Sequence, residues 1–256
     1  MNAAITAICF LGGAIIGSFV SVLAHRIPRG EPWATGRSRC PGCGAEIPAR
    51  DNVPILSWLA LRGRCRSCGE RISARYPLAE AGLGLLYAIT YLVLGDDDAG
   101  ELALGLVFCT VLVAITLTDL ELRLIPNVLV LAGAIAAIGI AAATHASSLD
   151  TRVLAAVAAG GGLFLIALAY PQGMGMGDVK LAAMMGLFLG RAVAPALLIG
   201  FATGAVLGVA LIARHGSEAR KRAVPFGPFL ALGGVIALWV GDEIVDWYLD
   251  TFFPSS

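Results

Sequence analysis

Long apolar runs alternate with short polar segments along almost the whole 256-residue chain. Runs of about 17 to 25 apolar residues cross the hydrocarbon core of a bilayer as helices. The pattern predicts an all-α fold, a polytopic bundle of about eight membrane helices with one small polar insert between the first and the second. The predicted spans are 3–24, 77–95, 101–118, 127–143, 152–170, 179–190, 193–213 and 227–249.

The composition supports a membrane protein, since 58% of the residues are hydrophobic and only 14% are charged. A soluble domain of this length cannot bury so much apolar surface. The first apolar run, 3–24, has no basic residue before it, whereas a secretory signal peptide carries one. We therefore expect this run to be retained as a membrane span.

The sixth predicted span, 179–190, has only 12 residues and a length of about 18 Å as a helix. That is short of a hydrocarbon core of about 30 Å, and the alternative is one longer span, 179–200. The basic residues favour two spans, because eight crossings place 16 of the 18 Lys and Arg residues on one face. The positive-inside rule makes that face cytoplasmic and places both termini outside.

The polar insert divides the chain into three parts. The first span occupies 1–25, the insert occupies 26–76, and a membrane-embedded bundle occupies 77–256. Ten of the 18 basic residues are arginines of the insert, so the positive-inside rule places the insert in the cytoplasm. The opposite face carries acidic segments such as "GDDDAG" at 95–100.

Two CxxC pairs lie in the insert, Cys40 with Cys43 and Cys65 with Cys68. Their spacing, CxxC–x21–CxxC, predicts a tetrahedral Zn²⁺ site of the zinc-ribbon kind, and a glycine after each pair eases the tight turn. Four thiolates leave no ligand position open, so the predicted zinc is structural and stabilises an insert that has little core of its own. The alternative is redox-active or idle cysteines, and the reducing cytosol disfavours disulfides.

Two aspartates lie at the ends of predicted spans, Asp119 after the third and Asp178 before the sixth. Two spans separate them, so both are predicted at the same cytoplasmic edge although they are 59 residues apart. Carboxylates at that depth are costly and indicate a function. Two like charges held close together share a proton, which provides one acid and one base to activate water for attack on a peptide carbonyl. Gly175 and Gly177 have no side chains, so a substrate backbone could approach the pair closely.

A structural role for the same aspartates is the alternative. Asp178 precedes a predicted helix start at Val179 and would be a good N-cap. Arg123 and Lys180 are also near enough in sequence to be ion-pair partners. The residues alone therefore leave catalysis and capping open. Glu121 is expected to lie nearer the surface of its loop.

Four blocks of sequence occur in order between about residue 12 and about residue 190. They are "GSFVSVLAHRIPRG", "SRCPGCGAEIPARDNVPILSWLALRGRCRSCGERISARYPLAE", "TDLELRLIPN" and "GMGDVKLAAMMG". Together they resemble the bacterial type IV prepilin peptidases, which are aspartic proteases of the GxGD kind. The resemblance implies cleavage of a short basic leader from prepilins or pseudopilins at the cytoplasmic face of the bacterial inner membrane. Members with the cysteine-bearing insert usually also N-methylate the new N-terminal residue, using S-adenosylmethionine.

The resemblance also implies roles for individual residues. Asp119 matches the first catalytic aspartate of the family, Asp178 matches the second within "GMGD", and the four insert cysteines match the metal-binding tetrad. Ser21 and His25 stand where members often have asparagine and tyrosine, and neither position is catalytic in the family. Many members have aspartate where Glu121 stands, which fits Asp119 as the essential acid.

The methyl-transfer step is not marked by a glycine-rich nucleotide motif after a strand. Glu80, at the start of the second span, is a candidate to bind the positive charge of the methyl donor or the amine of the substrate. The alternative is an ion pair of Glu80 with Arg71 or Arg75.

Two other function classes fit parts of the pattern. One is a transporter that uses the two aspartates as ion ligands, and the other is a zinc-ribbon scaffold that docks partners at the membrane. The chain shows no internal repeat, and both aspartates are predicted at one edge, which favours the enzyme. Membrane lipid is the expected surrounding, nothing indicates a nucleic-acid partner, and the pattern does not define the oligomeric state.

Overall fold

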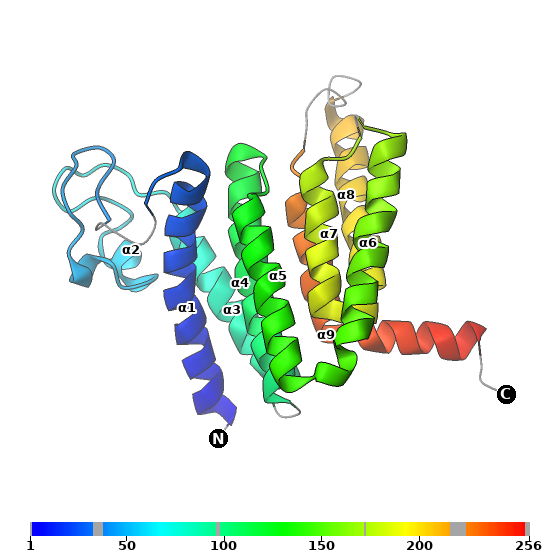
Figure 1. Cartoon of the computed structure of the whole chain (residues 1–256). Coiled ribbons are helices and arrows are strands. Elements are labelled where there is room, and N and C mark those ends of the chain that lie inside the picture. The colour runs from blue at the N-terminus through cyan, green and yellow to red at the C-terminus, as the bar shows by residue number, and fades with distance from the viewer. Residues whose placement is uncertain (1, 33–37, 96–97, 172, 216–223, 254–256) are drawn as a thin grey trace. The chain divides into compact units, whose positions relative to one another are not determined.

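The computed structural model of the chain consists of helices, most of them joined by short loops, and of a largely irregular insert between Arg26 and Arg75 (Figure 1). It describes residues 2–32, 38–95, 98–171, 173–215 and 224–253. Within these ranges the β-structure is limited to two isolated bridges, so the predicted all-α fold is confirmed. The contacts divide the chain into two compact units, Met1–Asp97 and Asp98–Ser256.

The first unit pairs the two helices that flank the polar insert, α1 (Asn2–Arg26) and α3 (Arg75–Leu94). Small side chains on α1 allow the two helices to pack closely, as is common between helices in lipid. The buried residues of α1 are Gly13, Ala14, Gly17, Val20, Ser21 and Ala24. The contacts therefore group the insert with both of its neighbouring helices, in one unit.

The insert is held by short elements rather than by an extensive core. It contains the 3-10 helices η1 (Ile27–Arg29) and η2 (Ala49–Asp51) and the short helix α2 (Leu56–Ala60). Trp58 of α2 donates its indole N–H to the carbonyl oxygen of Ile72 at 3.1 Å, which ties α2 to the chain that leads into α3. That such an insert needs a further source of stability stays a prediction.

The second unit is a bundle of helices that run in alternating directions (Figure 1). Its elements are α4 (Ala99–Leu122), α5 (Asn127–Thr144), η3 (Ala146–Ser148), α6 (Leu149–Ala169), α7 (Met176–Leu189), η4 (Gly190–Ala192), α8 (Val193–His215) and α9 (Gly227–Phe252). The helix α7 lies in the middle, in contact with α4, α5, α6, α8 and α9. Phe188 of α7 stacks on Phe108 of α4 with ring centroids 4.9 Å apart.

Seven segments of the described chain are long and apolar enough to cross a membrane. One of them, Met176–Arg214, has 39 residues and contains both α7 and α8. The two helices are separated by η4, where Gly190 has a φ of 54°, and they run in opposite directions (Figure 1). The alternative of one span at 179–200 is therefore wrong, and the predicted division of this segment is confirmed.

Candidate active site

Asp119 lies in the last turn of α4, which ends where Arg123 adopts a left-handed backbone with φ 52° and ψ 43°. The residue is only 5% exposed, which is unusual for an ionisable side chain. Its Oδ2 accepts a hydrogen bond of 2.8 Å from the backbone N–H of Gly227, the first residue of α9. The start of α9 thus holds the carboxylate at the end of α4.

Asp178 lies in the first turn of α7, where it is half-buried. Its carboxylate is close enough to that of Asp119 for a direct electrostatic interaction. The structure therefore brings the two aspartates together at the end of the second unit where α4 ends and α7 and α9 begin. This shared edge is the arrangement that the sequence predicted.

The capping alternative for Asp178 is wrong. The helix α7 begins at Met176, so its N-cap is Gly175, and no side chain caps its first turn. Lys180 donates to Asn127 Oδ1 at 2.9 Å and not to an aspartate. Among the described residues, neither aspartate forms a salt bridge, although Arg123 lies near enough to Asp119 to act on it through its charge.

The glycines beside Asp178 differ from one another in their surroundings. A Cβ on Gly175 would lie 3.3 Å from Asp178 Oδ2, so the missing side chain leaves the carboxylate uncovered. A Cβ on Gly177 would meet the Cβ of Ile125 at 3.1 Å, which gives Gly177 a packing role. Substrate approach at both glycines stays a prediction.

Gly227 is a site residue that the sequence analysis missed. A Cβ at this position would lie 2.8 Å from Asp119 Oδ2, so a larger residue cannot fit without movement of the carboxylate. The only signal in the sequence was the turn-like "PFGP" at 225–228, directly before the last predicted span.

The four insert cysteines form a candidate metal centre in the first unit. All four Sγ atoms lie within 4.8 Å of one another, and those of Cys40 and Cys68 are 3.7 Å apart. Thiolates around a tetrahedral Zn²⁺ at about 2.3 Å lie about 3.8 Å apart, so the geometry fits this ion.

Both halves of the centre have the same backbone. The N–H of the first cysteine of each pair donates to the carbonyl oxygen five residues on, at 2.9 Å for Cys40 and 2.8 Å for Cys65. Gly44 and Gly69, the glycines after each pair, have φ values of 71° and 73°, which require glycine for an unstrained turn. The predicted function of these glycines is confirmed.

The thiols of the centre differ in their acidity. Hydrogen bonds from the backbone N–H groups of Cys68 and Ser67 lower the pKa of Cys65 to about 7. The N–H of Glu70 lowers the pKa of Cys68, but its neighbour Cys43 and burial outweigh this effect and raise it to about 12. A dication bound by all four sulfurs would favour the thiolate form of each.

A cavity of about 430 Å³ lies within the first unit, beside the metal centre. Its wall includes Trp58, Tyr76 and the carboxylates of Asp51 and Glu80, together with Ser21 and His25 from α1. The Arg66 guanidinium donates to both oxygens of Asp51, at 2.6 and 2.8 Å, and holds the pKa of this carboxyl below its usual range.

Glu80 is only 8% exposed, and its Oε2 accepts a hydrogen bond of 2.6 Å from the backbone N–H of Ile55. Ile55 has a φ of 63° and lies at the centre of a tight turn, in which Leu56 N–H donates to the carbonyl oxygen of Pro54 at 2.6 Å. Such a conformation is strained for a β-branched residue. The donor to Glu80 is therefore a neutral N–H on a strained turn, and the ion pair with Arg71 or Arg75 is absent from the described contacts.

Comparison with known proteins connects both units to one group of enzymes. A chain from Aeromonas hydrophila is 37% identical over 95% of this chain and 93% of its own length. Chains from Pseudomonas aeruginosa and Bacillus subtilis are 34% and 36% identical over 93% and 94% of this chain, and over 91% and 97% of their own lengths. All three are named prepilin leader peptidase/N-methyltransferase.

The two family matches agree with these relatives. Residues 11–94 match the bacterial peptidase A24 N-terminal domain, and residues 106–209 match the type IV leader peptidase family. The chain belongs to the type IV leader peptidase family. No solved structure matches it significantly.

The two candidate sites of this member of the type IV leader peptidase family fall in different matched regions. The cysteine tetrad and Glu80 fall in the N-terminal match, and both aspartates fall in the leader-peptidase match. The apolar helices and the similarity to these relatives indicate that this family member is a multi-pass protein of the inner membrane. The transporter and scaffold alternatives are not favoured.

Proposed function

We propose that this protein cleaves the leader from type IV prepilins or pseudopilins and N-methylates the residue that cleavage exposes. The observation that carries the proposal is the pair Asp119 and Asp178, brought together at one end of a membrane bundle with no salt bridge to either one among the described residues. The names of the relatives supply the substrate class.

The hydrogen bonding suggests which aspartate acts as the base. The N–H of Gly227 stabilises negative charge on Asp119, because a hydrogen bond to the charged form favours that form. The backbone N–H of Gly175 has the same effect on Asp178, but the positive charge of Arg123 acts on Asp119 alone. Asp178 then carries the proton that the pair shares. Asp119 removes a proton from water, the water oxygen attacks the scissile carbonyl carbon, and Asp178 donates its proton to the carbonyl oxygen.

The resulting tetrahedral intermediate has two hydroxyl groups on the former carbonyl carbon. When the C–N bond breaks, the leaving nitrogen takes the proton held by Asp119, and one hydroxyl returns a proton to Asp178. The products are a carboxyl group on the leader and an amine on the mature protein, and the aspartates regain their starting states.

The active end is proposed to face the cytoplasm. The support is the charge pattern, since eight crossings put 16 of 18 basic residues on the side that carries both aspartates. A short basic leader would reach the pair from this side.

The metal is proposed to be one structural Zn²⁺ held by Cys40, Cys43, Cys65 and Cys68. The sulfur spacing fits this ion, and the four thiolates leave no position for a reacting water. The metal would stabilise the insert, which contains few packed elements of its own.

The methyl donor is proposed to bind in the cavity of the first unit, with Glu80 facing the positive charge. S-adenosylmethionine supplies a methyl group on a sulfonium, and the substrate supplies an amine, so either partner offers a cation to this buried carboxylate. Asp51 is already paired with Arg66, whereas the hydrogen bond to Glu80 comes from a neutral N–H. Trp58 and Tyr76 provide flat apolar surface in the same wall.

The test is incubation of purified protein with a prepilin peptide and mass spectrometry of the products. Asp119→Asn and Asp178→Asn should each abolish cleavage, and the double variant should be hardly worse than either single one, because the two act as a unit. Glu121→Gln is the matched control and should keep most activity. Methylation of a pre-cleaved substrate should persist in both aspartate variants. Substantial cleavage by folded Asp178→Asn protein would overturn the dyad.

A further inference from the structure

Arg152 is the only basic side chain that is buried among the described residues. It lies in the first turns of α6, at the end of the second unit opposite to the two aspartates (Figure 1). A buried guanidinium inside a membrane protein is costly unless it is fully paired, and it is a functional hypothesis by default. The proposed cleavage chemistry makes no direct use of it.

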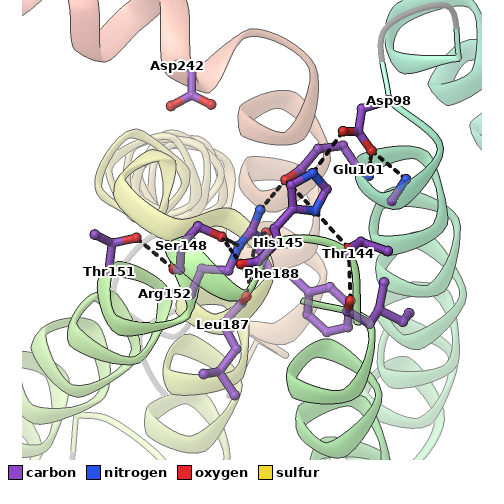
Figure 2. A network of polar contacts seen from close by, with 12 residues as sticks. Asp98, Glu101, Thr144, His145, Ser148, Thr151, Arg152, Leu187, Phe188 and Asp242 are labelled. Carbon is purple, nitrogen blue, oxygen red and sulfur yellow. Dashed lines mark hydrogen bonds and ion pairs between the residues drawn. The ribbon is translucent and has the colours of Figure 1, made fainter. Parts of the chain in front are cut away.

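The guanidinium joins α7 to α4, the helices that carry Asp178 and Asp119. Figure 2 shows its contacts at the other end of these helices. One Nη donates to the carbonyl oxygens of Leu187, at 3.5 Å, and of Phe188, both in the last turn of α7. The other Nη donates to Glu101, in the first turn of α4, as an ion pair. The Nε donates to Ser148 Oγ at 3.2 Å, so all three nitrogens of Arg152 are engaged.

The α4 end of this contact is itself held in place. Asp98 caps α4 by accepting the N–H groups of Gly100 at 2.6 Å and Glu101 at 3.2 Å. His145 lies against the same two acids, 2.8 Å from Asp98 Oδ2 and 3.9 Å from Glu101 Oε1 (Figure 2). Arg152 therefore connects α7 to Glu101, whose position at the start of α4 is held by Asp98 and His145.

The lengths of the two helices show why such a connection is needed. From Glu101 to Asp119 is 18 residues along α4, or about 27 Å. From Asp178 to Phe188 is 10 residues along α7, or about 15 Å. With the aspartates side by side, α7 stops well short of the start of α4. The last carbonyl groups of α7 need partners from outside the helix, and Arg152 supplies them for Leu187 and Phe188.

The apolar contacts of α7 also hold it in the bundle, since Phe188 stacks on Phe108 of α4 and Gly186 packs closely against the backbone of Ala156. Its other buried side chains include the flexible Met184 and Met185, which specify position less sharply. Hydrogen bonds to a planar guanidinium are directional, so they specify position more sharply than these contacts do.

We propose that Arg152 is a positioning residue that fixes the axial position of α7 against α4, and thereby the separation of Asp178 from Asp119. The role in cleavage rests on the proposed dyad, but the structural part of the inference does not. A helix of 14 residues moves as one rigid element, so a displacement at Phe188 is carried to Asp178. A misplacement of about 1 Å in a catalytic group can lower turnover about 100-fold.

The experiment measures position and activity separately. Spin labels on non-natural residues at Leu122 and Met176, which are 40% and 48% exposed, report the distance between the end of α4 and the start of α7. Arg152→Met should shift or broaden this distance by about 1.5 Å or more, the rise of one helical residue. It should lower kcat for cleavage about 100-fold with little change in KM, while methylation of a pre-cleaved substrate stays near wild type.

Two further variants keep the inference testable if Arg152→Met folds poorly. Arg152→Lys keeps the charge but lacks the planar fork, so it should give an intermediate shift and an intermediate loss. Glu101→Gln removes the ion pair but leaves the carbonyl contacts, and should act in the same direction. Arg191→Met is the matched control, since Arg191 lies at the same end of α7 but is 52% exposed and pairs with Asp242 and Asp246 of α9. It should leave the distance unchanged and keep kcat within about threefold of wild type.

Each outcome bears on the inference. An unchanged distance in folded Arg152 variants overturns it, whatever the activity, and so does a changed distance with unchanged kcat. If Asp178→Asn protein still cleaves, the dyad fails, but the distance measurement still decides whether Arg152 sets the position of α7.

Discussion

Replacement of Gly227 by alanine tests the geometry around Asp119 without removing a charge. The backbone N–H of Gly227 donates to Asp119 Oδ2 at 2.8 Å, and this donor is retained in alanine. The new Cβ would lie 2.8 Å from the same oxygen, 3.2 Å from Cγ and 3.3 Å from the Cβ of Asp119. An unstrained contact of a methyl carbon is about 3.5 Å or longer, so the carboxylate has to move by about 0.7 Å.

That movement sets the expected size of the effect. A misplacement of about 1 Å costs about 100-fold in rate, so about 0.7 Å predicts a loss of kcat of about 30-fold. This is about 2 kcal/mol of transition-state stabilisation. The KM for the prepilin should change little, because Asp119 is proposed to act in the chemical step and not in binding of the leader. Gly227 begins a helix and alanine is the better helix former, by about 1 kcal/mol, so thermal stability should not fall in proportion.

The assay is steady-state cleavage of a prepilin peptide, with the melting temperature measured on the same preparations. Gly161→Ala is the matched control, because a Cβ on Gly161 meets nothing within 4 Å. It should keep kcat within about twofold of wild type. If Gly227→Ala protein has a kcat within about threefold of wild type, the inferred contact does not position the catalytic carboxylate and the reasoning is refuted.

Two further predictions concern the first unit. The Cys40→Ser/Cys65→Ser double variant should lose the one Zn²⁺ that metal analysis is expected to find per wild-type chain, and should lose methylation at least as strongly as cleavage; absence of metal from folded wild type contradicts the zinc assignment. Glu80→Gln can still accept the Ile55 N–H, so it should fold normally but bind S-adenosylmethionine about 10-fold more weakly by calorimetry, as expected for the loss of one charged contact. The exposed Glu31→Gln serves as its control, and equal affinity in the two variants rules out a role of Glu80 in binding the donor.

The helices, the cysteine centre and the paired aspartates were predictable because each leaves a local pattern. Apolar runs mark the spans, and the CxxC spacing marks the knuckles whose glycines have positive φ. The number of spans between Asp119 and Asp178, which is two, was enough to predict that both lie at the same edge of the bundle. The structural alternative for Asp178 failed because α7 begins at Met176, three residues before the predicted start at Val179. Glycines at 175 and 177 had made that turn of helix resemble a loop.

The contacts that complete the site were not predictable, because they connect distant residues through groups that every residue has. Gly227 acts on Asp119 through a backbone N–H across 108 residues of sequence. Arg152 acts on α7 through the carbonyl oxygens of Leu187 and Phe188. Backbone donors and acceptors carry no sequence signal, so only the packed structure shows which side chain meets them.

The two basic residues that depart from the charge asymmetry, Arg152 and Arg191, show why such exceptions are informative. Sixteen of the 18 basic residues fall on the predicted cytoplasmic face, and these two do not. Each is paired with acids of its own face, Arg152 with Glu101 and Arg191 with Asp242 and Asp246. A paired arginine contributes little free positive charge, so neither weakens the predicted orientation. They differ in burial, and burial separates their roles: an exposed pair stabilises little, whereas a buried guanidinium persists only where every donor has a partner. A residue that breaks a rule of composition and is also buried is the one whose removal should disturb the function, and in this chain that residue is Arg152.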